Sequence, residues 1–219
     1  MDGERKQLDQ RDYVLECVCD EPNNKVVRFV RPTKLTLEHF QFIWEKLSQF
    51  DVLFNDWTRG DFKAFVDRFI QKTEDGTYIC PSLMWDVDDV GLFVLSNVRP
   101  AISAEAHFTF WDRRFSGRED LCRAMLQYVF DRYKFKRIEV RIPIYARPAL
   151  AAVERIGFIH EGRLRDSVLY KDNWHDVNLY SMLPKDMEDT PRHNTSVFKR
   201  KTVCQGCGKK YKTMKGVGV

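Results

Sequence analysis

The sequence contains no long hydrophobic run. None of its segments approaches the roughly 20 consecutive apolar residues that a membrane-spanning helix needs. Residues 1–6 are mostly polar or charged and no apolar segment follows them, so no secretory signal is predicted. We therefore expect a cytoplasmic protein with no membrane partner.

Acidic residues are missing from the C-terminal segment. Residues 198–219 hold seven Lys and Arg and no Asp or Glu. Because the formal net charge of the whole chain is +4, the remaining residues are mildly acidic. A basic tail can bind nucleic acid or an acidic protein, or stay solvated, and the sequence leaves these alternatives open.

Cysteine is sparse, with six copies in 219 residues, and we expect reduced thiols in a cytoplasmic chain. Cys204 and Cys207 form a C-x-x-C-G knuckle, a type that supplies two thiolates to zinc. No second CxxC follows it, so a tetrahedral site needs ligands from elsewhere. Cys17 and Cys19 could complete a four-thiolate site if the two termini meet, and His193 is a further candidate. The alternative is a metal-free tail.

What the sequence does contain is typical of a folded globular protein. Hydrophobic residues make up 43% of the chain and aromatic residues 13%. The length suits one α/β domain with a short appendage. We predict an N-terminal extension over 1–24, the domain over 25–184, and a basic tail over 185–219.

Hydrophobic periodicity predicts the elements of that domain. The expected helices cover residues 36–50, 61–72, 118–133 and 147–156. The expected strands cover residues 25–31, 77–85, 91–98, 104–111, 137–142, 158–164 and 176–183. Hairpin connections between neighbouring strands favour a mixed, mostly antiparallel sheet with helices on both faces.

The junction between the strand at 104–111 and the helix at 118–133 is the most informative segment. Backbone N–H groups at the start of a helix have no intrahelical partner, and with a nearby glycine they can cradle a phosphate. The alternative is a capping box, Ser116-x-x-Glu119, in which the helix satisfies its own donors. The motif alone leaves both interpretations open.

Three further motifs carry a resemblance to a known family. Residues 114–119 match its pyrophosphate motif, Arg/Gln-x-x-Gly-x-Gly/Ala, at Arg114 and Gly117. Residues 153–158 resemble the end of its characteristic helix, and the segments 161–166 and 174–183 are similar to its closing strands. With the order of elements, these residues resemble the GNAT superfamily of N-acetyltransferases, particularly the branch that acetylates ribosomal-protein N-termini.

The resemblance implies a GNAT fold and direct transfer of an acetyl or other acyl group from coenzyme A to an amine. The acceptor could be a protein N-terminus or lysine, a small amine, or a nucleobase. Backbone N–H groups of the strand at 104–111 would stabilise the oxyanion. The residues implied at the coenzyme A site are Phe110, Trp111, Arg114, Phe115, Ser116, Gly117, Arg118, Glu119 and Asp120.

A general base must accept the proton of the attacking amine. Glu105 and His107 share one face of their strand because side chains alternate with period two. The resemblance places a carboxylate at Glu105, and histidine titrates near neutrality. A hydrogen-bonded role in the sheet is the alternative for both residues.

Two departures from the family pattern bear on activity. Glu119 and Asp120 place carboxylates at the expected diphosphate site. Ala146 and Ala149 stand where the family has Asn-x-x-Ser, whose serine protonates the leaving thiolate, and Tyr145 is a candidate replacement. The alternative function is therefore a catalytically degenerate GNAT-fold binding or structural protein that acts through its basic, cysteine-containing tail.

Overall fold

The computed structural model describes residues 13–21, 24–112, 115, 117–189 and 197–200. In this part of the chain, nine strands form one sheet in the order β11-β1-β2-β5-β6-β7-β8-β10-β9, and two more form a separate hairpin, β3-β4. In chain order the strands are β1 (Leu15–Glu21), β2 (Asn24–Pro32), β3 (Gln71–Lys72), β4 (Tyr78–Ile79), β5 (Leu83–Val87), β6 (Gly91–Arg99), β7 (Ser103–Phe110), β8 (Arg137–Pro143), β9 (Ile159–Tyr170), β10 (Asn173–Met182) and β11 (Val197–Arg200).

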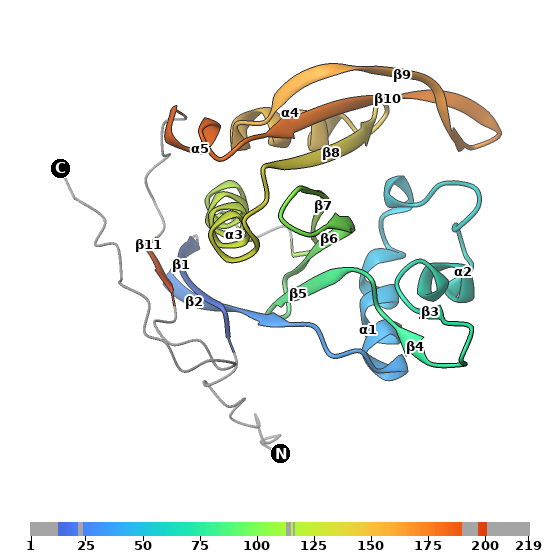
Figure 1. Ribbon diagram of the computed structural model, residues 1–219, viewed down its shortest axis with the longest axis horizontal. Coiled ribbons are helices and arrows are strands. Elements are labelled where there is room, and N and C mark those ends of the chain that lie inside the picture. The colour runs from blue at the N-terminus through green and yellow to red at the C-terminus, as the bar shows by residue number, and fades with distance from the viewer. Residues whose placement is uncertain (1–12, 22–23, 113–114, 116, 190–196, 201–219) are drawn as a thin grey trace.

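Helices cover both faces of this sheet (Figure 1). The helices are α1 (Leu37–Leu47), a 3-10 turn (Asp51–Leu53), α2 (Phe62–Asp67), α3 (Arg118–Tyr133), α4 (Arg147–Ile156) and α5 (Asp186–Asp189). In the figure, α3 lies on one side of the central strands and α1 and α2 lie on the other. The predicted fold class, a mixed and mostly antiparallel sheet between helices, is confirmed.

Strand β6 shows why the chain forms two hydrophobic cores. Its alternate side chains point to opposite faces of the sheet. Phe93 and Leu95 join the core that contains the apolar side of α3, while Leu92 and Val94 join the core under α1 and α2. All four are buried, and burying such a side chain contributes about 1.5–3 kcal/mol. The centre of the sheet is therefore fixed from both sides.

Strands β7 and β8 form the parallel pair of the described sheet. They are paired over three positions, from Ser103↔Arg137 to Glu105↔Glu139. Beyond Glu105 the pairing ends, although β7 continues to Phe110 and β8 to Pro143. The two strands thus diverge and leave the backbone of β7 without a β8 partner along its second half.

Several elements differ from the prediction. The segment assigned to the N-terminal extension contributes β1, which pairs with β2 along seven positions. The predicted helix over 61–72 ends early, and its last residues form β3, because Asp75 and Gly76 turn the chain back into β4. The predicted strand over 77–85 is interrupted at Pro81, which has no N–H for a ladder.

The β9–β10 hairpin is longer than predicted. Lys171 and Asp172 both have left-handed backbones, with φ of 53° and 59°. Two consecutive left-handed residues match the twist of a two-residue hairpin turn, so the strands continue to its edge. The predicted turn at this position is confirmed, and the hairpin projects beyond the rest of the sheet (Figure 1).

Candidate active site

Glu105 lies where β7 and β8 begin to diverge. Its carboxylate is only 13% exposed and accepts a hydrogen bond of 3.0 Å from Nδ2 of Asn97. Nε of Arg141, on β8, lies 3.7 Å from the same oxygen, Oε2. Three elements therefore fix and partly neutralise one carboxylate at the fork between the strands.

Asn97 reaches Glu105 because of a bulge in β6. The register between β6 and β7 shifts between Ser96 and Arg99, and Asn97 has a left-handed backbone with φ of 50°. Asparagine tolerates this conformation better than most residues. Asn97 was not among the predicted site residues, although an asparagine just before the Arg99-Pro100 turn was an available signal.

His107 shares the face of Glu105, as predicted from the strand period. Its Nε2 is 2.9 Å from the hydroxyl of Ser96 and 3.9 Å from Oε1 of Glu105. The surrounding protein desolvates the ring, although 43% of the side chain remains exposed, and this desolvation lowers the pKa of His107. Glu105 opposes that shift, and Arg68 reinforces it. The imidazole is therefore neutral at pH 7.

A cleft of about 620 Å³ opens beside Glu105 on the side of the sheet covered by α2. Its charged lining comprises Arg68, Arg99, Arg141, Glu105 and Glu139. The open face of a proposed base thus adjoins a space that is large enough for a small ligand.

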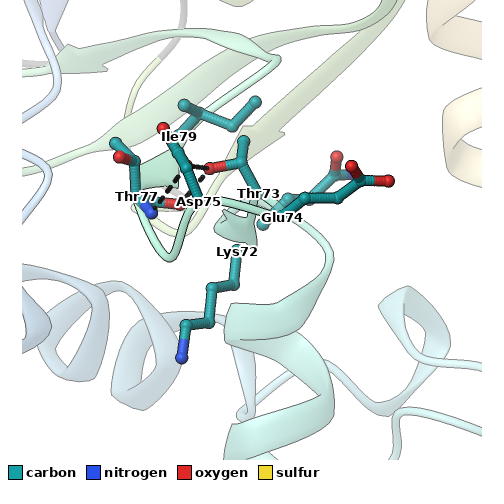
Figure 2. A pocket seen from close by; sticks show the side chains of 7 residues that line it. Lys72, Thr73, Glu74, Asp75, Thr77 and Ile79 are labelled. Carbon is teal, nitrogen blue, oxygen red and sulfur yellow. Dashed lines mark hydrogen bonds between the residues drawn. The ribbon is translucent and has the colours of Figure 1, made fainter.

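A second hollow lies at the turn of the β3–β4 hairpin, away from Glu105. Figure 2 shows Asp75 bonded to the hydroxyl of Thr73 and to the backbone N–H of Thr77, while Lys72 and Glu74 point elsewhere. The polar groups of this hollow are occupied by the turn itself. It is a structural feature of the hairpin and offers no set of converging reactive groups.

The junction that follows β7 is anchored by its own side chains. Phe115 is buried and contacts Phe110 at 5.3 Å between ring centroids. Arg118 donates from Nε to the carbonyl of Phe115 at 2.7 Å and from Nη2 to that of Asp112 at 3.0 Å. Its guanidinium therefore braces the loop, a role that the sequence analysis did not predict. Gly117 is the N-cap of α3.

Glu119 turns away from the start of α3. Its Oε1 accepts hydrogen bonds from Nε and Nη2 of Arg155, on α4, at 3.1 and 2.8 Å. Gly117 is the N-cap of α3, and Ser116, the other member of the predicted capping box, lies outside the described residues. The ion pair with Arg155 partly compensates the charge of the Glu119 carboxylate. Arg114 and Ser116 lie outside the described residues, and Asp120 follows Glu119 in the first helical turn.

Phe110 and Trp111 pack against the protein at the end of β7. A Cβ on Gly91 would lie 2.4 Å from the ring of Phe110, so only glycine permits this packing. The indole N–H of Trp111 donates to the carbonyl of Asp89. Its ring lies edge-on to that of Phe42, with 6.3 Å between the ring centroids. In this structure both aromatic residues fix the strand end.

Tyr145 lies between β8 and α4. Its ring stacks on that of Tyr170, with 4.2 Å between the ring centroids, and the ring of His175 lies edge-on to it, with 5.0 Å between the centroids. Burial, then Tyr170, raises the pKa of Tyr145, while Arg59 opposes the shift. The phenol therefore stays protonated at neutral pH, as a proton donor must. Ala146, which follows it, is the N-cap of α4 and offers no hydroxyl.

The connection between α1 and α2 holds the tip of the β9–β10 hairpin. The carboxylate of Asp56 accepts the backbone N–H groups of Asp172 and Lys171 at 2.9 and 3.0 Å. These bonds lower the pKa of Asp56, with that from Asp172 the largest cause. Near these residues in the chain, the exposed indoles of Trp57 and Trp174 lie with their ring centroids 6.0 Å apart and their planes inclined by 60°.

The zinc hypothesis stays a prediction. Within the described ranges, no group of three or more His, Cys, Asp and Glu could hold a metal ion. Cys204, Cys207 and His193 lie outside those ranges, and of Cys17 and Cys19 only the backbone, in β1, is described. Strand β11 pairs with β1, so part of the C-terminal segment does meet the N-terminal one.

Comparisons with known proteins agree with this architecture. No family model matches the chain. The chain is 27% identical over 110 residues to a protein of Bacillus subtilis (strain 168) described as "Putative ribosomal N-acetyltransferase YdaF". That match covers 48% of this chain and 60% of the relative, so the chain spans less than two thirds of the relative's length.

Two solved structures show the same fold. RimJ of Mycobacterium smegmatis, in complex with CoA-disulfide, aligns with a TM-score of 0.59 and 16% identity, covering 80% of this chain and 90% of RimJ. Spermidine N-acetyltransferase of Vibrio cholerae, in complex with CoA and spermine, aligns with a TM-score of 0.57 and 17% identity. This alignment covers 73% of this chain and 98% of the Vibrio cholerae chain. The chain has the GNAT fold, and its predicted resemblance to the GNAT N-acetyltransferases is confirmed.

In the part of the chain that the structure describes, no helix is both long enough and apolar enough to cross a membrane.

Proposed function

We propose that this protein is an N-acyltransferase that moves an acetyl group from coenzyme A to an amine. The observation that carries the proposal is the fork at Glu105, where β7 and β8 diverge beside a cleft. The half of β7 that has no β8 partner runs toward the junction that precedes α3. A thioester arm can lie along that strand while the first-turn amides of α3 receive the diphosphate.

The chemistry at the fork is a direct displacement. A neutral amine attacks the thioester carbonyl, so a C–N bond forms and the C–S bond breaks. Glu105 takes the proton of the amine, directly or through water, and backbone N–H groups of β7 stabilise the oxyanion. The proton on Tyr145 is available to the leaving thiolate. His107, neutral and bonded to Ser96, is the alternative base.

The donor site is built mainly from backbone groups. The amides of residues 117–120 face the diphosphate, and Arg114 adds positive charge as the family motif implies. Because Glu119 pairs with Arg155, the negative charge that this carboxylate brings to the proposed diphosphate site is partly compensated. Arg118 contributes by holding the loop rather than by offering an unoccupied guanidinium.

Calorimetric titration of the purified chain with acetyl-coenzyme A tests the proposal. We expect micromolar binding, with free and desulfo-coenzyme A as controls, and release of free thiol when a suitable amine is added. Absence of binding at millimolar acetyl-coenzyme A would contradict the proposed activity and favour the degenerate binding protein.

A metal assay on the same sample decides whether Cys204 and Cys207 hold zinc.

A further inference from the structure

Three arginines from three different elements line the cleft beside Glu105. Arg68 is the C-cap of α2, Arg99 ends β6, and Arg141 lies on β8. In the part of the chain that the structure describes, neither Arg68 nor Arg99 forms an ion pair with a carboxylate. Arg141 is 50% exposed and forms an ion pair with Glu105, in which Nε and Oε2 lie 3.7 Å apart.

The carboxylates of the cleft do not balance these cations. Two carboxylates, Glu105 and Glu139, line the cleft with three arginines, and Glu139 also accepts a hydrogen bond of 2.7 Å from Nε of Arg137. The positive field extends to His107. Desolvation is the largest cause that lowers the pKa of this histidine; Glu105 opposes the shift, and Arg68 lowers the pKa further. The space next to the proposed base is thus electrostatically suited to a negative group.

We propose that this cleft binds an amine acceptor that carries its own carboxylate or phosphate close to the reacting nitrogen. The proposal rests on the proposed function, because it takes Glu105 as the site of amine deprotonation. Guanidinium groups bind carboxylate and phosphate oxygens through paired N–H donors. The same arginines repel a polycation, so the acceptor differs in class from the spermine bound by the Vibrio cholerae structure.

Calorimetry with matched amines tests this proposal. The protein with coenzyme A present is titrated with O-phosphoethanolamine, β-alanine, ethanolamine and spermidine at low salt. We expect at least one anionic amine to bind about tenfold more tightly than ethanolamine, with spermidine weakest. The phosphate and carboxylate probes distinguish the two sources of negative charge. Equal affinity for ethanolamine and both anionic amines, or no binding of either anionic amine, would overturn the proposal.

Variants localise the effect. Arg68→Ala and Arg99→Ala should each remove most of the preference for the anionic amine, and Arg→Lys at either position should retain part of it. Arg132→Ala, an exposed arginine on α3, is the matched control and should change nothing. If the cleft variants alter only the affinity for coenzyme A, the arginines serve the donor and the inference is wrong. Acetylation of ethanolamine without any anionic preference would leave the proposed function standing while this inference fails.

Discussion

The two sides of the fork between β7 and β8 are built differently. On the donor side, after β7, charged side chains are bonded to the protein itself: Arg118 to loop carbonyls and Glu119 to Arg155. On the acceptor side, around Glu105, two arginines have no described carboxylate partner and His107 is neutral. Under the proposed function, backbone groups thus remain for the donor, and side chains remain for the acceptor.

This difference separates two kinds of substitution. Under the proposed function, a change on the acceptor side removes a group that meets the substrate, whereas a change on the donor side acts by rearranging the loop or its electrostatics. Acceptor-side variants should therefore lower turnover at constant donor affinity. Donor-side variants should lower the affinity for acetyl-coenzyme A and leave turnover unchanged.

The largest effect is expected for Glu105→Gln. Loss of the base should lower kcat by about 10²–10⁴-fold, the range typical of general acid–base catalysis, while acetyl-coenzyme A binds as before. Steady-state kinetics and calorimetry on the same preparation measure both quantities. Weakened donor binding would show that the two sides of the fork are not separate.

His107→Gln is the matched control on the same face. Because the pKa of His107 lies below its ordinary value of 6.5, the ring is already neutral at pH 7 and its loss removes no charge there. We expect most of the turnover to remain. If this variant loses turnover and Glu105→Gln retains it, His107 is the base.

Asn97→Gly should give the next largest effect. Glycine accepts the left-handed backbone of this position but removes the donor to Glu105, so kcat should fall about tenfold, the cost of one hydrogen bond to a charged group. Ala101→Gly is the control, since Ala101 is also left-handed, with φ of 57°, in the turn that follows β6. Similar kinetics in the two variants would assign the bulge a purely structural role.

On the donor side, Arg155→Ala releases Glu119 next to the diphosphate amides. A like charge at about 4 Å costs about 1 kcal/mol in water, so acetyl-coenzyme A should bind about fivefold more weakly. Adding Glu119→Gln should restore the affinity, because the coupling runs through that carboxylate. If the double variant binds as weakly as Arg155→Ala alone, Arg155 acts by another route.

The sequence predicted some elements to the residue and missed others for a physical reason. Helices α3 and α4 match their predicted bounds, because each is amphipathic and ends at a left-handed residue, Lys134 and Gly157. Strands β1 and β11 were missed, since they are rich in charged and polar residues and depend on pairing between distant segments. Local periodicity contains no information on such pairing.

The candidate site divides in the same way. The shared face of Glu105 and His107 followed from the period of one strand. Arg141 and Arg155 could not be predicted, because each reaches the site from a different element, and Asn97 had only the neighbouring turn as a local signal. Residue spacing within a segment predicts neighbours on that segment, and long-range contacts require the folded sheet.

The smallest effect is expected for Glu161, a carboxylate that does not line the cleft. Hydrogen bonds from Arg137 and then Ser181 lower the pKa of Glu161 from 4.5 to about 2. A lowered pKa stabilises the fold above pH 4.5, and this contribution is lost as the pH falls toward 2. Since the pair is largely exposed, the contribution should not exceed about 1 kcal/mol.

In urea unfolding, Glu161→Gln should therefore be less stable than the wild-type chain at pH 7, and the difference should shrink at pH 3. Glu74→Gln, at the exposed β3–β4 turn, should match the wild-type chain at both values. An equal deficit of Glu161→Gln at pH 7 and pH 3 would show that packing, rather than charge, accounts for it.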